Sequence, residues 1–78
     1  MTGLTLEYED DGLPPPKIRK LLRQSAAMTQ AEMGAKLGVT AAAVSGWETG
    51  SSPIGDLRVA YARMLRDLRA ELAGGHAY

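Results

Sequence analysis

The sequence predicts an all-α domain of four or five helices behind an extended acidic leader. Apolar residues recur at intervals of three and four from residue 17 to residue 73, which is the period of one helix face. Glycine, proline and residues that cap helices interrupt this pattern where helices should end or begin. We therefore expect a proline-ended acidic leader over residues 1–16, a compact helical domain over residues 17–73 and a flexible tail over residues 74–78.

The composition limits the class of protein. The 78 residues allow one domain with a small core, which would gain stability from dimerisation. The absence of cysteine excludes disulfides and thiolate metal sites. No apolar run reaches the roughly 18 residues that a membrane span needs, and acids stand where an export signal needs bases. We expect a cytoplasmic protein that makes no contact with a membrane.

The leader carries the largest charge imbalance of the chain. It holds four acids and no base, whereas residues 17–50 hold five bases and two acids, and the formal net charge of the chain is zero. Leu4, Leu6 and Tyr8 alternate with other residues in a pattern typical of a strand. Because a lone strand leaves its edges unpaired, two alternatives stay open: pairing with another strand, such as the same segment of a second subunit, or no regular structure. We expect the prolines at positions 14–16 to hold the leader away from the helical domain.

The first predicted helix runs from Pro16 or Lys17 to Ser25, because proline suits the first helical position. Its spacing separates apolar side chains from basic ones. The expected core residues are Ile18, Leu21 and Leu22, and the expected more exposed residues are Lys17, Lys20 and Arg23.

The second predicted helix opens with a capping box made by Thr29 and Glu32, and it runs to Leu37. Gly38 suits the left-handed conformation that ends many helices. Gly34 has no side chain at the point where another helix must come close. A tight turn is therefore expected directly after this helix.

The third predicted helix is capped by Thr40 and covers residues 41–49. Val44 and Trp47 are three residues apart and should both point into the core. Gly50 fits the position just past the end of the helix.

After a loop, apolar residues form one long stripe that ends at a pair of glycines. No helix breaker interrupts it, so it predicts either one long helix or two helices in direct succession. In so short a chain the last leucines have no obvious core to fill, which favours a dimer surface. The stripe contains Ile54, Leu57, Tyr61, Met64, Leu65, Leu68 and Leu72, and the candidate dimer contacts are Tyr61, Leu65, Leu68 and Leu72.

Residues 18–65 resemble the Cro/C1-type (XRE-like) helix-turn-helix family of phage repressors and small bacterial regulators. The resemblance rests on a basic first helix, on Met28-Thr29-Gln30, on Leu37-Gly38-Val39-Thr40 at the turn, and on Val44-Ser45-Gly46-Trp47-Glu48-Thr49-Gly50. It implies a sequence-specific, repressor-like regulator of transcription that is associated with the nucleoid. Such a regulator binds double-stranded DNA as a homodimer, with its third helix in the major groove.

The resemblance also implies a set of site residues. Gln30 would bind a backbone phosphate at the start of the second helix, and Thr29 would add its hydroxyl or its N–H. Arg23 would pair with Glu48 and so join the first helix to the end of the third. The loop after the third helix usually carries a basic residue, but here it has Ser51, which brings no charge. The remaining phosphate candidates are Lys17, Arg19, Lys20 and Lys36.

The residues of the third helix that would meet base edges are all small. They are Thr40, Ala41, Ala42, Ala43, Ser45 and Gly46. Alanine cannot form the bidentate hydrogen bonds that distinguish base pairs, although its methyl group can contact a thymine methyl. Three alternatives follow: specificity from thymine methyls, water and DNA shape; DNA binding with little sequence preference; or a third helix that packs against a protein.

Two functions stay open at this point. The first is the DNA-binding regulator, and the alternative is an interaction protein, such as an antitoxin or an adaptor, with weak or nonspecific DNA binding. The acidic leader is either a solvated tail or a segment that competes with DNA or meets a basic partner. Catalysis, a cofactor and a metal site are not expected, because the chain has no cysteine and its one histidine, His76, stands alone in the tail.

Overall fold

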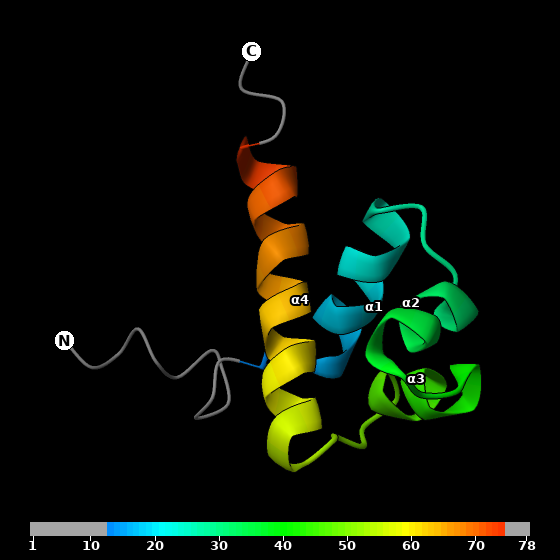
Figure 1. Ribbon diagram of the computed structural model, residues 1–78. Helices are drawn as coiled ribbons and strands as arrows, with labels where there is room; N and C mark the ends of the chain where they lie inside the picture. Colours follow the sequence, from blue (N-terminus) through cyan, green and yellow to red (C-terminus); the bar gives the residue numbers. More distant parts are fainter. Residues whose placement is uncertain (1–12, 75–78) are drawn as a thin grey trace, which may run out of the picture.

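The computed structural model describes residues 13–74, and these residues form four helices and no strand. The helices are α1 (Pro16–Ser25), α2 (Gln30–Leu37), α3 (Ala41–Trp47) and α4 (Gly55–Gly74). The helices α1, α2 and α3 lie on one side of α4, which runs along the whole length of the domain (Figure 1). The predicted all-α fold is therefore confirmed. None of these four helices combines the length and the apolar character that a membrane span requires.

The helix boundaries agree closely with the sequence pattern. Both α1 and α2 have the predicted limits, whereas α3 ends at Trp47, two residues earlier than expected, and Glu48 is its C-cap. The apolar stripe forms one uninterrupted helix, α4, which decides between the two alternatives. The strand candidates Leu4, Leu6 and Tyr8 lie outside the described residues, as do the tail residues 75–78.

The core lies where the first three helices meet α4. Its centre holds Val44 and Trp47 of α3 against Tyr61 of α4, and the two aromatic rings have centroids 4.6 Å apart at an interplanar angle of 44°. Such tilted aromatic pairs add to the gain from burial. Leu22 from α1 and Met33 from α2 belong to the same buried cluster. The expected core positions of α3 are thus confirmed.

The folded unit begins earlier than the sequence predicted. Leu13 is 0% exposed and belongs to the core, and Pro14 is also buried. Residues 14–16 were expected to hold the leader away from the helices. This expectation is wrong for Leu13 and Pro14, which are buried in the helical domain. Pro16 is the first residue of α1, as expected.

Two residues of α1 lie on faces other than those predicted. Leu21 is 55% exposed, although it was expected in the core, whereas Leu22 takes its expected inward position. Ile54, the first residue of the apolar stripe, precedes α4 and is 83% exposed. Arg23 was expected to be more exposed but is buried.

The proposed dimer stripe of α4 is mostly internal. Tyr61, Leu65 and Leu68 are buried within the single chain, so the prediction that they form an intermolecular surface is wrong. Tyr61 packs against Trp47 of α3, and Leu65 and Leu68 belong to the same core, which α4 shares with α1 and α2. The sequence alone did not reveal this core. Only Leu72, at 45% exposed, remains accessible from that set.

Candidate nucleic-acid interface

The start of α2 is fixed by the predicted capping box. The hydroxyl oxygen of Thr29 accepts a hydrogen bond from the backbone N–H of Glu32 at 3.0 Å, and the Thr29 N–H donates to the Glu32 carboxylate at 2.8 Å. These bonds satisfy two donors of the first helical turn. The Thr29 N–H is therefore occupied, which corrects the expectation that it could bind a phosphate. The hydroxyl hydrogen is still available as a donor.

The turn between α2 and α3 depends on two glycines. A β-carbon at Gly34 would lie 2.6 Å from the carbonyl oxygen of Val39, so the backbone of the turn fits only against a residue without a side chain. Gly38 has φ 77°, the left-handed conformation in which glycine has no steric cost. Both roles were predicted and are confirmed. They bring α3 directly across the end of α2.

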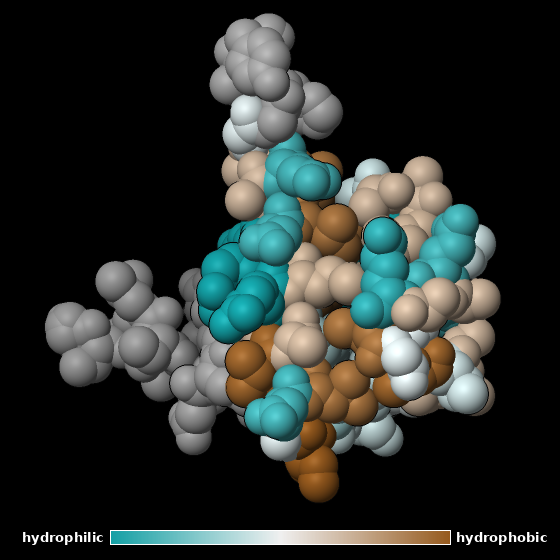
Figure 2. Space-filling view, in the orientation of Figure 1, coloured by the Kyte–Doolittle hydropathy of each residue, from teal (hydrophilic) through white to brown (hydrophobic). Residues whose placement is uncertain are grey.

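The outer face of α3 is small and uncharged. Thr40 accepts a hydrogen bond from the Ala43 N–H at 3.1 Å, as expected of an N-cap. Ala42 is exposed, whereas Ala43 is half-buried and packs against the core. Figure 2 shows the surface over α3 mainly in the pale tones of alanine, glycine and hydroxyl residues. The other predicted base contacts, Ala41, Ser45 and Gly46, are half-buried.

The C-terminal end of α3 is held by a buried ion pair. Arg23 Nε lies 2.6 Å from Glu48 Oε2, and Arg23 Nη2 donates to Glu48 Oε1 at 3.0 Å. Gln30 donates from its amide nitrogen to the same Oε1 at 3.1 Å. This is the bidentate geometry in which a guanidinium binds a carboxylate most strongly. The pair that the resemblance implied is thus present, and it joins α1, α2 and the end of α3.

The surroundings of this pair shift both pKa values. Burial alone would raise the pKa of Glu48, but the hydrogen bonds from Arg23 and Gln30 and the positive charge of Arg23 outweigh burial, so the pKa is lowered. The hydrogen bond with Glu48 raises the pKa of Arg23. Both shifts favour the charged forms.

Arg19 has a structural position, and its prediction as a phosphate contact is wrong. It is 1% exposed, and its guanidinium donates to the carbonyl oxygens of Pro14 at 2.6 Å, Trp47 at 2.9 Å and Ser51 at 2.9 Å. A spacing signal could have revealed this, because Arg19 lies three residues before the core residue Leu22 and shares its face. We call Arg19, Arg23 and Glu48 the arginine clamp.

The other predicted cations are accessible. Lys17 and Lys20 are exposed on α1, and Lys36 is exposed on α2. Ser51 is also exposed in the loop after α3. The structure therefore leaves three of the four basic phosphate candidates on the surface and places the fourth, Arg19, in the core.

Tyr61 is a buried polar residue that the sequence did not reveal. Its side chain is fully buried, and among the described residues its hydroxyl has no hydrogen-bond partner. Burial raises its pKa to about 12.

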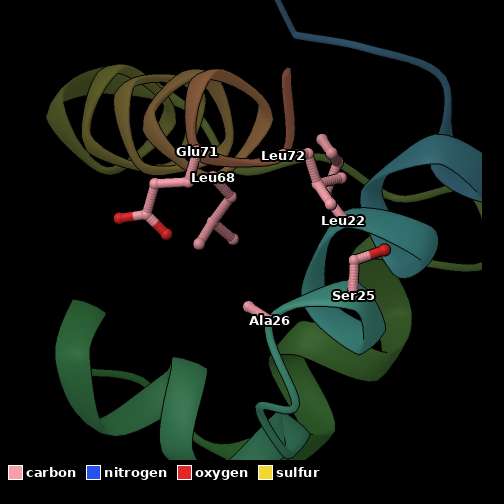
Figure 3. Close-up of a pocket in the computed structure, with 6 residues that line it drawn as sticks. All are labelled: Leu22, Ser25, Ala26, Leu68, Glu71 and Leu72. Carbon is pink, nitrogen blue, oxygen red and sulfur yellow. The ribbon is translucent and has the colours of Figure 1, made fainter. Parts of the chain in front are cut away.

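The described residues form a groove between α1 and α4 but hold no cluster of metal ligands. A groove of about 120 Å³ separates the end of α1 from the second half of α4 (Figure 3). It is lined by Leu22, Ser25, Ala26, Leu68, Glu71 and Leu72. Within residues 13–74 no three acidic, histidine or cysteine side chains lie close enough to hold a metal ion.

Comparison with known families identifies the fold. The family model HTH_3, described as Helix-turn-helix, matches residues 19–66, which include most of α1, all of α2 and α3 and the first half of α4. No curated protein and no solved structure matches the chain. The chain belongs to the Cro/C1-type, XRE-like helix-turn-helix family of DNA-binding transcriptional regulators.

Proposed function

We propose that this protein is a sequence-specific, repressor-like regulator that inserts α3 into the major groove of DNA. The observation that supports this proposal is the way α3 is held. Two arginines of α1 contact its C-terminal end, while its outer face is left open to solvent. A recognition helix must keep its direction and leave its outer side chains accessible. We propose that the protein does so in the cytoplasm, on the nucleoid.

The start of α2 is the proposed phosphate site. Gln30 uses one amide hydrogen on Glu48, and its second amide hydrogen remains for a phosphate oxygen. The bond to Glu48 also orients the amide, which lowers the entropy lost on binding. The proposed additional contacts are Thr29 and Ser51 through their hydroxyls, and Lys17, Lys20 and Lys36 through their charge.

The base contacts are proposed to be mainly apolar. Ala42 is the exposed alanine of α3, and its methyl group suits contact with a thymine methyl. Thr40 and Ser45 can each make one hydrogen bond, and Ala41, Ala43 and Gly46 allow a close approach of the helix. Sequence preference would then come from thymine methyls, bridging water and DNA shape.

We also propose a homodimer, because two recognition helices about 34 Å apart match one turn of DNA. The contacts must come from side chains that the monomer leaves exposed. The large apolar candidates are Leu21, Ile54, Val59 and Leu72. Sedimentation equilibrium, which gives the mass in solution, tests the dimer with the wild type and with Leu72→Glu. A monomeric mass of the wild type contradicts the proposed dimer.

A protein-binding role is the second candidate, since the uncharged outer face of α3 could also pack against a protein. An antitoxin or an adaptor would use this face and would bind DNA weakly. Copurification of a stable partner together with no DNA binding at low salt would favour this role.

Fluorescence anisotropy tests the main proposal. The protein is titrated against the DNA upstream of its own gene and against a scrambled duplex of equal length, each at two salt concentrations. Tighter binding to the upstream DNA, weakened by salt, supports an operator-binding regulator. Equal binding to both duplexes contradicts sequence specificity, and no binding to either contradicts the proposal as a whole.

One replacement in the DNA and one in α3 test whether the protein recognises thymine methyl groups. Replacing thymine by deoxyuridine removes only the methyl groups, so we expect weaker binding of the preferred duplex. The same replacement in the scrambled duplex is the control. Ala42→Gly should reduce the difference between the thymine and uracil duplexes, whereas an unchanged difference would contradict the role of Ala42.

The lysines of α1 are predicted to contribute through charge alone. Lys17→Ala together with Lys20→Ala should weaken binding to both duplexes and lower the slope of log affinity against log salt by about 2. Arg63→Ala together with Arg66→Ala removes the same charge from exposed positions of α4 and is the matched control. An equal change of slope in both variants would show that the position of the lysines is irrelevant.

A further inference from the structure

Glu48 connects the end of α3 to the proposed phosphate site at the start of α2. Its backbone N–H is the C-cap of α3 and donates to the carbonyl oxygens of Val44 and Ser45. Its carboxylate is buried, and Oε1 accepts a hydrogen bond from Gln30 Nε2 at 3.1 Å. One residue therefore ends α3 with its main chain and holds a side chain of α2 with its carboxylate.

Arg23 fixes two groups beside the start of α2. Its Nη1 donates to the backbone carbonyl oxygen of Met28 at 2.8 Å, two residues before Gln30. Its Nε and Nη2 donate to the two carboxylate oxygens of Glu48 at 2.6 Å and 3.0 Å. The guanidinium is planar and its donors have a fixed geometry. The backbone before α2 and the carboxylate that binds Gln30 are therefore held by the same rigid group.

The bond to Glu48 decides which way the amide of Gln30 faces. A charged carboxylate can only accept hydrogen bonds, so Gln30 must turn its NH2 group, and not its oxygen, toward Glu48. Burial opposes the charged form, but the hydrogen bonds from Arg23 and Gln30 outweigh it and lower the pKa of Glu48, so the carboxylate is charged at neutral pH. The second N–H of the amide is thereby fixed in direction as well. A phosphate oxygen requires such a donor, whereas an amide that turns over presents its own oxygen and repels it.

We infer that Glu48 is a positioning residue for DNA binding, whose carboxylate orients the amide of Gln30 toward a backbone phosphate while its main chain ends α3. This inference rests on the proposed DNA-binding function and deepens it. Because one residue joins the two elements, the phosphate contact of α2 keeps a fixed position relative to the helix in the major groove. The ion pair between Arg23 and Glu48 then contributes to affinity as well as to stability.

A double-mutant cycle in the full chain tests whether Glu48 acts through Gln30. Wild type, Glu48→Gln, Gln30→Ala and the double variant are titrated against the upstream duplex by fluorescence anisotropy. In Glu48→Gln one acceptor oxygen remains for three donors, so we expect the bond to Gln30 to weaken. Removing a negative charge would by itself strengthen DNA binding, so a weaker complex cannot result from the charge.

The chain offers a matched control. Gln24→Ala removes the same amide group from an exposed position of α1. Circular dichroism melts check that every variant is folded at the temperature of the titration.

We expect Gln30→Ala to weaken binding about tenfold and Glu48→Gln to weaken it about fivefold. The double variant should bind within about twofold of Gln30→Ala, because the contact that Glu48 orients is already absent. Gln24→Ala should bind within about twofold of wild type. The inference is overturned by losses that multiply in the double variant, and also by wild-type affinity of either Glu48→Gln or Gln30→Ala.

The side-chain amides give a second measurement that needs no DNA. The chain has two glutamines and no asparagine, so the 15N NMR spectrum of wild type holds only two side-chain NH2 groups, and Gln30→Ala assigns them. We expect the proton shifts of the Gln30 amide to differ from those of the exposed Gln24. In Glu48→Gln, which adds a third NH2 group, they should move toward the Gln24 values while those of Gln24 stay.

The two measurements separate the inference from the proposed function. A Gln30 amide that keeps its shifts in Glu48→Gln overturns the inference, and the proposed function stands if wild type binds DNA. A wild type that binds neither duplex overturns both.

Discussion

The C-terminal end of α3 and its outer face are built from opposite chemistry. At the end, Arg19 and Arg23 bind backbone carbonyls and the buried carboxylate of Glu48. On the outer face, Thr40 and Ala42 offer one hydroxyl and one methyl group. The chain thus uses its strongest polar interactions to orient the helix and leaves little polar chemistry for the ligand. Charged residues in such a domain therefore do not by themselves mark the binding surface.

Removing the carboxylate of the arginine clamp should have the largest effect. Glu48→Ala leaves Arg23 buried without its partner, which we expect to reduce the free energy of unfolding by about 3–5 kcal/mol. Urea denaturation measures this loss. Lys20→Ala, on the exposed side of the same helix α1, is the control and should change stability by less than about 0.5 kcal/mol. Similar losses in both variants would contradict the distinction between the clamp and the surface.

The ion pair between Arg23 and Glu48 also predicts that the stability of the protein depends on pH in the acid range. The pKa of Glu48 in the folded state lies below its ordinary value of 4.5, so the unfolded chain binds a proton first as the pH falls. The stabilisation by the pair is therefore present above pH 4.5 and is lost as the pH falls through the folded pKa. Thermal melts between pH 7 and roughly pH 3 should show a smaller acid loss in Glu48→Gln than in wild type. An equal loss in both would contradict this assignment.

The close contact between Gly34 and the turn before α3 can be tested separately. Gly34→Ala would place a β-carbon 2.6 Å from the Val39 carbonyl oxygen, and such overpacking should cost about 1–3 kcal/mol. Gly46→Ala is the matched control, because its β-carbon would meet only Ser51 at 3.9 Å. That control should be neutral or stabilising by up to about 1 kcal/mol. Destabilisation of both variants to the same extent would contradict the close approach at Gly34.

Tyr61 offers the smallest and sharpest test. Its buried hydroxyl has no partner among residues 13–74, so Tyr61→Phe should keep the contact with Trp47 and raise stability by up to about 1 kcal/mol. Because burial raises its pKa from 10 to about 12, wild type should lose stability as the pH rises from 10 through 12. The variant should lack this alkaline loss. A destabilised Tyr61→Phe would instead indicate a hydrogen bond that the described residues do not provide.

Several elements follow from short-range chemistry and were predictable. The capping box of Thr29, the left-handed Gly38 and the N-cap at Thr40 each depend on residues three or four positions apart. Such patterns are set by backbone geometry, which is the same in every fold. The conformation of the turn between α1 and α2 was harder to predict from the sequence, because Ala27 adopts φ 56° although it is not glycine.

The packing partners of each face were decided only by the tertiary structure. Helical periodicity shows that Arg19 and Leu22, or Leu65 and Leu68, share a face, but it does not show what covers that face. Leu65 and Leu68 of α4 belong to the core that α4 forms with α1 and α2 in the same chain, and so they do not form the predicted dimer surface. Arg19 is buried because three backbone carbonyls converge on its guanidinium. Two of those carbonyls belong to Trp47 and Ser51, which are 28 and 32 residues from Arg19 in the sequence, and only the folded chain brings them to its guanidinium.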